Sequence, residues 1–413
     1  MAATTQPAAA ILRAKGPAAV LGIGTANPSN CVRQDEFTDW YFRVTKSSQH
    51  IRLEEKMKRI CVKSGIKKRY LHHTEDMITS HPEFLHRTMP SLSARLRICA
   101  EAAAKLAADA SMRAIKEWGG GGGGGGCRTA TDITHLVVST NSGAHEPGVD
   151  FRVAGLLGLR PTVHRTLLNL HGCSAGFAAL QVAKNLAENN RGARVLVTCS
   201  QAMVLSFHGL DDDTHSHSIV ANCIFGDGAG AVIVGADPTG PIERPIFYAV
   251  STAQVTLPGT EKAVGLHLSE TGLDIGISVE VPTLVRDSIK QCIVDAIAPL
   301  GLLPNACDGG WNSFFWWAVH PGGRAILDNF KAALDLEPNK LAPSYHVLSE
   351  YGNMTGATIF FVLDDIRRRP KDGVEKEAGI RSEWGVMSGL GPGLTVETFV
   401  LYMPPPAMTK SSS

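Results

Sequence analysis

Short runs of continuously apolar residues, each ending in small or polar residues, constrain the fold of this chain more than any other feature. The runs lie at 18–28 (AAVLGIGTANP), 133–143 (ITHLVVSTNSG), 193–200 (ARVLVTCS) and 229–236 (AGAVIVGA). Runs that are apolar at every position are typical of strands in a sheet that helices cover on both faces. A long amphipathic helical pattern over 93–117 lies between the first two. The sequence therefore predicts an α/β fold with polar residues at the ends of buried strands.

The second part of the chain repeats the pattern of the first, in which apolar strands end in polar or Gly-rich loops and alternate with helices. A Pro-rich segment, PTGPIERP (238–245), separates the two parts. After it come a long helical pattern, a strand that ends in a His loop, an Asn loop before a helix, and a Gly-rich turn between strands (about 281–299, 314–323, 347–369 and 385–403). We therefore expect two pseudo-duplicated halves, 17–238 and 245–403.

Three segments are expected to stay outside the packed core. Residues 1–16 and 404–413 are predicted to be a flexible leader and a flexible tail. The eight glycines Gly119–Gly126 would lose much backbone entropy on ordering, so they are predicted to form a mobile surface loop. This run is not a phosphate-binding loop, because the strand, Lys and helix of such a motif do not surround it.

Composition excludes several classes of protein. The 413 residues hold 40 Lys and Arg against 39 Asp and Glu, a formal net charge of +1, so nothing indicates binding to nucleic acid or to an anionic membrane surface. The nine Cys include no CxxC pair and no metal-ligand spacing. With no apolar signal segment near the start, they indicate reduced thiols in a cytoplasmic protein. Apolar runs such as 314–319 are too short to cross a bilayer, so no transmembrane segment is expected.

The segment 167–189, LLNLHGCSAGFAALQVAKNLAEN, places Cys173 at a tight turn between a strand and a helix. Unpaired N–H groups and the positive end of the helix dipole would favour a thiolate at that position. Gly172 and Gly176 would let other groups approach closely. These features predict a nucleophile, and the alternative is a buried structural Cys, which is the commoner fate of a free thiol.

His320 and Asn353 occupy comparable points of the second half. His320 precedes Pro321, which holds its backbone in an extended conformation at the end of a strand. Asn353 lies in GNMTG, where an Asn is by default a turn residue. Each alone is more often structural, but Cys, His and Asn together suit acyl transfer through a covalent thioester. A papain-like protease uses the same residue types, yet the local signature around its Cys is absent here.

A basic helix face is the remaining candidate binding feature. Lys56, Arg59 and Lys63 fall on one face of a predicted helix over 50–64, at i, i+3 and i+7. Without further context, such a face is most simply a solvated surface.

Several motifs in fixed order make the chain similar to the plant type III polyketide synthases, the chalcone and stilbene synthase family. The similarity runs from about residue 17 to about residue 402 and looks closest to the grass enzymes that form curcuminoids or alkylresorcinols. The motifs are VLGIGTANP, KKRYLHHTE, GCSAG, FGDGAGAVIVG, WWAVHPGG, SEYGNMTGAT and GLGPGLTVET.

This resemblance implies a thiolase-like fold with five αβαβα layers, formed by the two halves, and a homodimer. It also implies an enzyme that loads a CoA-linked starter onto Cys173, extends it by decarboxylative condensation with malonyl-CoA and cyclises the polyketide. No metal and no cofactor other than these CoA thioesters is expected.

The resemblance assigns roles residue by residue. Cys173 is the nucleophile, and His320 and Asn353 complete the triad as donors to the thioester and enolate oxygens. Full ionisation of a Cys with an ordinary pKa gains only about 30-fold in thiolate, whereas one oxyanion donor is typically worth about 10²–10³-fold. We therefore expect the larger share of catalysis from the two donors. The other matched positions are the gatekeeping Phe225, the cavity loop Gly389–Gly393, and Lys56, Arg59 and Lys63 for the phosphates of CoA.

Several predicted cavity positions depart from the chalcone-forming pattern. These changes reshape the cavity and favour a starter, chain length or cyclisation other than those of a standard chalcone synthase. They are Leu266 for Gly, Ser206 and Met203 for Thr, Thr355 for Ser, Ile275 for Phe and Leu390 for Phe.

Glu146 stands where the family has a Met that crosses into the cavity of the partner subunit. An unpaired carboxylate would be costly to bury there. We therefore expect either that this loop turns outward or that a cation pairs with Glu146.

Two other functions stay open on the sequence. One is a β-ketoacyl synthase III-like acyltransferase that makes a single condensation, which the chain length of the product would distinguish. The other is a catalytically silent homologue that acts as a binding subunit, which the intact triad argues against.

Overall fold

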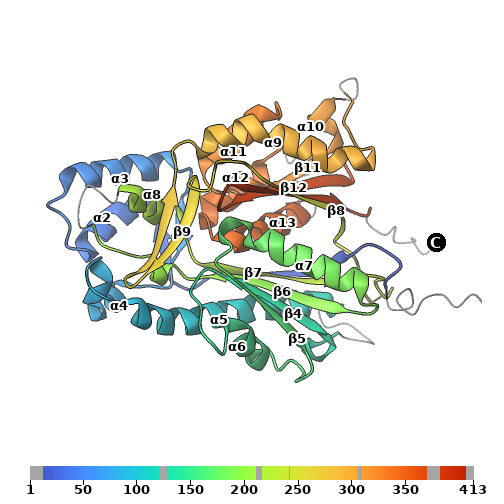
Figure 1. Cartoon of the computed structure of the whole chain (residues 1–413), viewed down its shortest axis with the longest axis horizontal. Helices are drawn as coiled ribbons and strands as arrows, with labels where there is room; N and C mark the ends of the chain where they lie inside the picture. The colour runs from blue at the N-terminus through green and yellow to red at the C-terminus, as the bar shows by residue number, and fades with distance from the viewer. Residues whose placement is uncertain are drawn as a thin grey trace, which may run out of the picture.

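The structure is a computed structural model that describes residues 13–120, 128–210, 216–240, 242–305, 309–369 and 382–405 (Figure 1). Most of the predicted leader (1–12), of the glycine run (121–126) and of the predicted tail (406–413) therefore lies outside the described residues.

The described chain is built around one sheet of nine strands, in the order β11-β12-β13-β8-β1-β7-β6-β4-β5. One block consists of β1 (Ala19–Ala26), β7 (Gly228–Gly235), β6 (Arg194–Gln201), β4 (His135–Thr140) and β5 (His164–Asn169). The other consists of β8 (Phe247–Thr256), β13 (Thr395–Tyr402), β12 (Trp384–Gly391) and β11 (Trp316–Val319).

The two blocks repeat one pattern of pairing. From β1, two antiparallel pairings (β1–β7 and β7–β6) are followed by the parallel pairing β6–β4. From β8, two antiparallel pairings (β8–β13 and β13–β12) are followed by the parallel pairing β12–β11. A short pairing of β1 with β8, at Ala19 with Tyr248 and Val20 with Phe247, joins the blocks.

Helices cover both faces of this sheet, as the continuously apolar strands require. On one face of the first block, α5 (Leu92–Trp118) packs on β1, β7 and β6, and α6 (Val149–Leu156) packs beside α5. On the other face lie α7 (Ala175–Asn189) and α13 (Thr358–Arg368), which Figure 1 shows between the two blocks. On the outer face of the second block, α9 (Val281–Ile297) packs on β13 and β8. The predicted α/β class is confirmed.

The two central helices approach each other closely at a pair of glycines. A Cβ atom at Gly176 in α7 would lie 2.3 Å from the carbonyl oxygen of Gly356, which comes just before α13. A Cβ at Gly356 would lie 2.7 Å from the backbone nitrogen of Gly176. Only glycine fits at both places, because larger residues would push the helices apart. This close approach brings the turn before α7, with Cys173, against the turn before α13, with Asn353.

Most of the remaining elements lie at one end of the sheet (Figure 1). Beyond one end, Figure 1 shows α2 (Gln34–Val44), α3 (Ile51–Lys63), α4 (Glu75–Ser80), α8 (Ser216–Ile224) and the hairpin of β9 (Val264–Ser269) and β10 (Gly272–Ile277). The short strands β2 (Cys31–Arg33) and β3 (Lys68–Tyr70) pair with each other. The second half adds α10 (Gly310–Phe314), α11 (Arg324–Ala333) and α12 (Ala342–Tyr351). Among the described residues, the short 3₁₀ helices are η1 (Pro82–Leu85), η3 (Ala130–Asp132), η4 (Gly172–Ser174), η5 (Met203–Leu205), η7 (Ala298–Leu300) and η9 (Thr355–Ala357).

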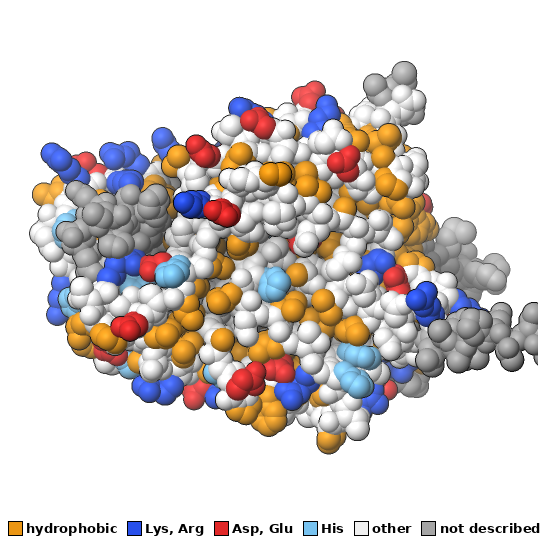
Figure 2. Space-filling view, viewed as in Figure 1, with side chains coloured by type: hydrophobic (Ala, Val, Ile, Leu, Met, Phe, Trp, Pro, Cys, Tyr) orange, Lys and Arg blue, Asp and Glu red, His pale blue; other side chains and the backbone are white. Residues whose placement is uncertain are grey.

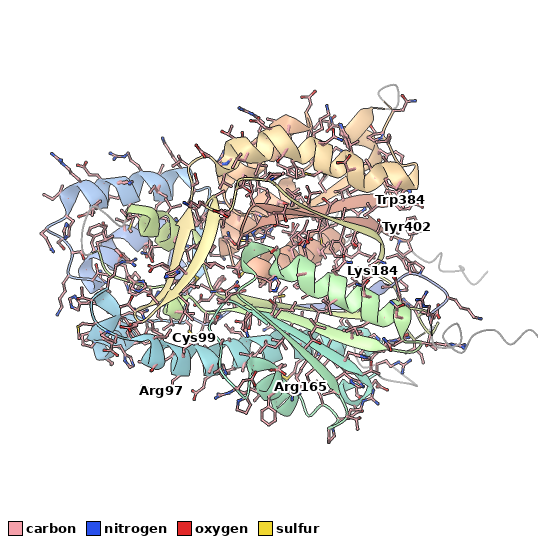
Figure 3. All side chains as sticks on the ribbon, viewed as in Figure 1. Arg97, Cys99, Arg165, Lys184, Trp384 and Tyr402 are labelled. Carbon is pink, nitrogen blue, oxygen red and sulfur yellow. The ribbon has the colours of Figure 1, made fainter. Side chains whose placement is uncertain are left out.

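Two aromatic side chains pack against each other at the end of the sheet away from α3. Trp384 at the start of β12 and Tyr402 at the end of β13 are opposite each other in the sheet. Their ring centroids are 5.3 Å apart with the planes at 60°, and Figure 3 labels both. Among the described helices, we find none with the length and apolar character needed to span a bilayer.

Candidate active site

Cys173 lies where the sequence predicts, between β5 and α7, inside the short helix η4. Gly172 before it has φ +58°, and a Cβ on Gly172 would lie 2.5 Å from Cγ of Pro392. The turn is held by Asn141, whose Oδ1 accepts a hydrogen bond from the Gly172 N–H at 2.9 Å. A glycine is therefore required next to the nucleophile both by conformation and by space.

Asn353 presents its amide nitrogen to the thiol. Its Oδ1 accepts a hydrogen bond from the Thr355 N–H at 2.8 Å, and its Nδ2 donates to the carbonyl oxygen of Gly322 at 3.1 Å. These two bonds fix the orientation of the amide, since oxygen and nitrogen each have a partner of the matching type. Nδ2 lies 3.7 Å from Sγ of Cys173.

His320 follows β11 directly, and its backbone N–H donates to the carbonyl oxygen of Ser388 at 2.8 Å. The side chain is only 1% exposed, and neither ring nitrogen has a hydrogen-bond partner within the described chain. Both ring nitrogens therefore stay available to a group bound in the cavity.

Phe225 and Asn353 are fixed to each other through the backbone. The Asn353 N–H donates to the carbonyl oxygen of Ile224, and the Gly226 N–H donates to that of Asn353, both at 2.9 Å. Nη1 of the buried Arg69 also donates to the Phe225 carbonyl oxygen at 2.5 Å. The Phe225 ring is 5% exposed and therefore has a well-defined position beside the triad.

One cavity of about 560 Å³ contains the main predicted site residues. Its wall includes the three triad side chains together with Phe225, the basic side chains of α3 and Leu390, which lies near the end of β12 and not in a loop. Most of the other side chains on this wall are apolar. They include Ile60, Val220, Ile224, Val264, Ile277, Val281, Ile326 and Leu394. The structure thus brings together residues from both parts of the chain that the sequence could only group by resemblance.

The predicted basic residues of this cavity have no acidic partner in the part of the chain that the structure describes. Lys56, Arg59 and Lys63 form no ion pair with any described residue. Figure 2 shows several Lys and Arg side chains gathered on the surface over α3. Lys58, on another face of the same helix, pairs with Glu54 at 2.8 Å and Asp39 at 3.1 Å. Three uncompensated cations around one cavity attract an anionic ligand.

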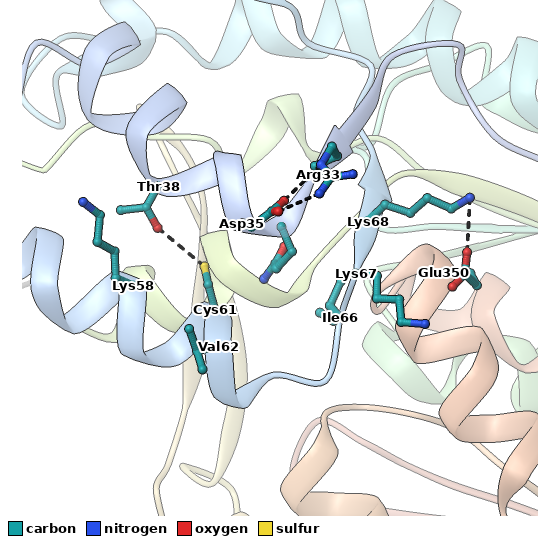
Figure 4. A pocket seen from close by; sticks show the side chains of 11 residues that line it. Arg33, Asp35, Thr38, Lys58, Cys61, Val62, Ile66, Lys67, Lys68 and Glu350 are labelled. Carbon is teal, nitrogen blue, oxygen red and sulfur yellow. Dashed lines mark hydrogen bonds and ion pairs between the residues drawn. The ribbon is translucent and has the colours of Figure 1, made fainter.

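A second hollow, of about 630 Å³, lies against another side of α3 (Figure 4). It is slightly larger, but its cations are largely neutralised: Arg33 pairs with Asp35 at 2.6 Å and Lys68 with Glu350 at 3.1 Å. No member of the triad lines it. We therefore place the candidate active site in the smaller cavity.

The pKa values of the Cys–His pair differ from the expectation. Burial raises the pKa of Cys173 to about 11, an effect that the weaker opposing contact with Asn353 does not cancel. Burial also lowers the pKa of His320 to about 4. The expectation that the position of Cys173 favours a thiolate is therefore wrong for the free enzyme, because burial of the thiol raises its pKa. Both groups are neutral near pH 7.

Leu266 and Ile275 lie beside the site but not on the wall of this cavity. They are directly opposite each other in the β9–β10 hairpin. Cδ1 of Leu266 comes within 3.4 Å of the position that a Cβ on Gly172 would occupy. Leu266 therefore adds its bulk next to the Cys173 turn, as the departure from Gly at this position suggested.

Met203, Ser206 and Thr355 also stand apart from the wall of the cavity. Met203 belongs to η5, and the Ser206 hydroxyl donates back to the Met203 carbonyl oxygen at 3.3 Å. Thr355 is 6% exposed and takes part in a hydrogen-bond network behind the triad. Whether these residues face a bound polyketide stays a prediction.

That network contains two residues that the sequence analysis did not select, Asn141 and Gln201. Asn141 Nδ2 donates to Oγ1 of Thr355, and this hydroxyl donates to Oε1 of Gln201, both at 3.2 Å. The network restrains Thr355 at φ +50°, a strained conformation for a β-branched residue. Asn141 and Gln201 follow or end buried strands, so the rule that led to His320 would also have found them.

Glu146 is exposed in the loop between β4 and α6. The single chain therefore does not bury this carboxylate, and its position in an assembly stays a prediction. Within the described residues, no group of three or more His, Cys, Asp or Glu side chains is arranged to hold a metal ion.

Comparison with known proteins defines the class of this site. Residues 6–238 match the model of the N-terminal domain of chalcone and stilbene synthases, and residues 248–404 match that of the C-terminal domain. The chain therefore belongs to the chalcone and stilbene synthase family. It is 52% identical over 393 residues to bisdemethoxycurcumin synthase of Oryza sativa subsp. japonica, a match that covers 94% of this chain and 93% of the relative.

The predicted resemblance is thus confirmed. The chain is a type III polyketide synthase, an acyltransferase that extends a CoA-linked starter by decarboxylative condensation with malonyl-CoA.

Proposed function

We propose that this synthase carries out its chemistry in the 560 Å³ cavity, with Cys173, His320 and Asn353 as catalytic residues and with Lys56, Arg59 and Lys63 binding the CoA phosphates. The observation that carries the proposal is the composition of this cavity. A thiol, an imidazole and an oriented amide share an apolar wall with three cations, and among the described residues neither the imidazole nor these cations have a polar or acidic partner.

In the loading step, a ring nitrogen of His320 accepts the Cys173 proton as the sulfur attacks the carbonyl carbon of the acyl-CoA. The tetrahedral oxyanion accepts a hydrogen bond from Asn353 Nδ2–H, which points toward the thiol. The intermediate collapses, the C–S bond to CoA breaks, and His320 returns the proton to the departing CoA thiol. The acyl group is then held on Cys173 as a thioester.

In the extension step, the malonyl carboxylate leaves as CO₂ and its C–C bond electrons form an enolate. The enolate oxygen is that of the CoA thioester, and Asn353 and His320 are the donors that stabilise it. The enolate carbon attacks the acyl-Cys173 carbonyl, and the Cys173 sulfur leaves. The apolar ring of Phe225 would disfavour the charged carboxylate in the ground state next to it.

The product is proposed to be of the curcuminoid type and not a standard chalcone. Two observations support this choice. The 52% identical relative is named for bisdemethoxycurcumin, and Leu266 narrows the space beside Gly172.

The fold is proposed to be the thiolase-like arrangement of five αβαβα layers, with halves over 17–238 and 245–403. The repeated pairing pattern and the central helices α7 and α13 support this arrangement. We also propose a homodimer, to which the exposed Phe151 and Leu156 of α6 would contribute apolar surface. Cysteine usage favours a cytoplasmic location, and CoA thioesters are proposed as the only small molecules required.

Mass spectrometry of the products tests the function. Purified protein is incubated with malonyl-CoA and p-coumaroyl-, hexanoyl- or long-chain fatty acyl-CoA, with Cys173→Ala as the control. Polyketides that depend on Cys173 support the proposal, and the preferred starter identifies the product class. Products of one condensation with every starter would instead favour a β-ketoacyl synthase-like activity, and no product from folded protein would favour a silent homologue.

A further inference from the structure

Arg324 is a cation of the active-site cavity that belongs to the C-terminal part of the chain. It is the first residue of α11 and lines the same cavity as Lys56, Arg59 and Lys63 of α3. Its Cδ comes within 3.3 Å, and its Nη1 within 3.6 Å, of the position that a Cβ on Gly65 would occupy. Arg324 therefore lies against the segment that follows the C-terminal end of α3.

Within the described ranges of the chain, the guanidinium of Arg324 has few interactions. Its ion pair is with Asp328, where Nε and Oδ2 are 3.6 Å apart and both side chains are about half exposed, at 56% and 45%. Asp328 is also bound by the Tyr345 hydroxyl, which donates to Oδ1 at 2.5 Å. Such an exposed pair contributes little energy. Most of the five N–H donors of this Arg are thus available to a ligand.

We propose that Arg324 binds a phosphate group of the CoA thioester, together with the three cations of α3. This inference rests on the proposed use of the cavity for CoA. A guanidinium donates two parallel hydrogen bonds to a phosphate, which a lysine does not. The phosphates would thereby be held by α3 from the N-terminal part of the chain and by α11 from the C-terminal part.

The proposal makes Arg324 a binding residue and not a catalytic one. The phosphates of CoA do not change charge between the ground state and the transition state of loading or decarboxylation. An interaction with them is uniform binding, so its loss raises KM and leaves kcat unchanged.

The test compares a thioester that has the phosphates with one that lacks them. Malonyl-CoA and the malonyl thioester of N-acetylcysteamine are used with wild type, Arg324→Ala and Arg324→Lys. Arg286→Ala is the matched control, because Arg286 is an exposed arginine of α9 that pairs with Asp287 at 3.1 Å and does not line the cavity. CO₂ release from each thioester gives KM and kcat.

Arg324→Ala is expected to raise KM for malonyl-CoA about fivefold. Its kcat, and its KM for the N-acetylcysteamine thioester, should stay within twofold of wild type. Arg324→Lys should recover part of the loss, and Arg286→Ala should match wild type. An equal rise of KM for both thioesters, or no rise for either, would overturn the proposal.

Calorimetric titration with free CoA and with pantetheine measures the role of Arg324 in binding without any turnover, so it can be tested even if the proposed function is wrong. If the wild type turned over neither thioester, the proposed function would fail, but the affinity for CoA would still be measurable. Arg324→Ala is then expected to weaken CoA binding about fivefold and to leave pantetheine binding unchanged. Equal binding of CoA by the variant and the wild type would refute the role of Arg324 directly.

Discussion

Replacing Asn353 by Ala tests the chemistry of the site most directly. Oδ1 of Asn353 accepts a hydrogen bond from the Thr355 N–H, and one hydrogen of Nδ2 is donated to the Gly322 carbonyl oxygen. The second hydrogen of Nδ2 is directed at Cys173 Sγ, 3.7 Å from Nδ2, and it can be donated instead to the oxygen of a thioester bound next to Cys173. A donor fixed in this way is typically worth about 10²–10³-fold in rate, or about 2.7–4 kcal/mol. We therefore expect Asn353→Ala to lower kcat for malonyl-CoA decarboxylation about 100- to 1,000-fold.

The assay follows CO₂ release from malonyl-CoA, which requires the enolate but no starter. KM is expected to change less than threefold, because Asn353 acts mainly on charge that develops in the transition state. Asn353→Asp is the matched variant. Its carboxylate still accepts a hydrogen bond from the Thr355 N–H, so the turn before α13 is preserved, but it places an acceptor and a negative charge where the donor was.

The two variants separate a donor role from a structural one. If Asn353 acts as a donor, Asn353→Asp loses at least as much kcat as Asn353→Ala, because its charge repels the enolate. Recovery of decarboxylation in Asn353→Asp would show that only the turn matters. A loss of less than tenfold in Asn353→Ala would refute the reasoning altogether.

Three further changes test the burial, the packing and the cavity. Burial lowers the pKa of His320 to about 4, so the unfolded chain takes up a proton at this residue at a higher pH than the folded chain does. The free energy of unfolding therefore decreases as pH falls below the ordinary His pKa of about 6.5. His320→Gln should therefore lose about 2 kcal/mol less stability than wild type between pH 7 and pH 5 in urea unfolding, and equal losses would contradict this. Gly176→Ala should destabilise the protein by about 1–3 kcal/mol, since its Cβ would lie 2.3 Å from a backbone oxygen. Gly276→Ala is the control and should not destabilise the protein, because Gly276 is an exposed residue of β10 whose Cβ would have no heavy atom within 4 Å. Leu266→Ala should raise kcat/KM for p-coumaroyl-CoA relative to hexanoyl-CoA in a competition assay, and an unchanged ratio would exclude it as a selectivity residue.

Strand and helix positions could be predicted because each rested on a local pattern. The apolar run 193–200 corresponds to β6 (Arg194–Gln201), and the pattern 93–117 corresponds to α5 (Leu92–Trp118). The turn at Cys173 was also local, since a strand, two glycines and a helix pattern are adjacent in the sequence.

The arrangement of the site depends on contacts that no local pattern contains. The orientation of the Asn353 amide follows from Gly322, a residue of another loop. The contribution of Arg324 to the cavity follows from its position against Gly65, which belongs to the other half of the chain. The hydrogen bonds of Thr355 are also between distant segments: its hydroxyl accepts from Asn141 Nδ2 and donates to Gln201 Oε1, while its place beside a bound polyketide stays a prediction.

The pKa values of Cys173 and His320 show that ionisation of the thiol is a larger part of the barrier than a Cys with an ordinary pKa would imply. With a Cys173 pKa of about 11, forming a free thiolate near pH 7 costs about 5 kcal/mol, at 1.36 kcal/mol per pH unit. This free energy is larger than the stabilisation of about 2.7–4 kcal/mol expected from one oxyanion donor. For a Cys with an ordinary pKa, forming the thiolate near pH 7 would cost only about 2 kcal/mol. His320, with a pKa of about 4, is uncharged near pH 7 and therefore does not stabilise a thiolate at Cys173 in the free enzyme.

A neutral thiol next to a neutral imidazole favours proton transfer during the attack and not before it. As the sulfur bonds to the acyl carbon, its pKa falls, and the charge moves to the thioester oxygen, where Asn353 Nδ2–H lies ready to donate. The proton then leaves for His320 while an oxyanion is present to attract the imidazolium, so the two charges form together in the same low-dielectric cavity and stabilise each other. The same burial that makes the resting thiol inert therefore strengthens each of these interactions in the transition state, which is why a dry, apolar wall around a polar triad is an effective arrangement for acyl transfer.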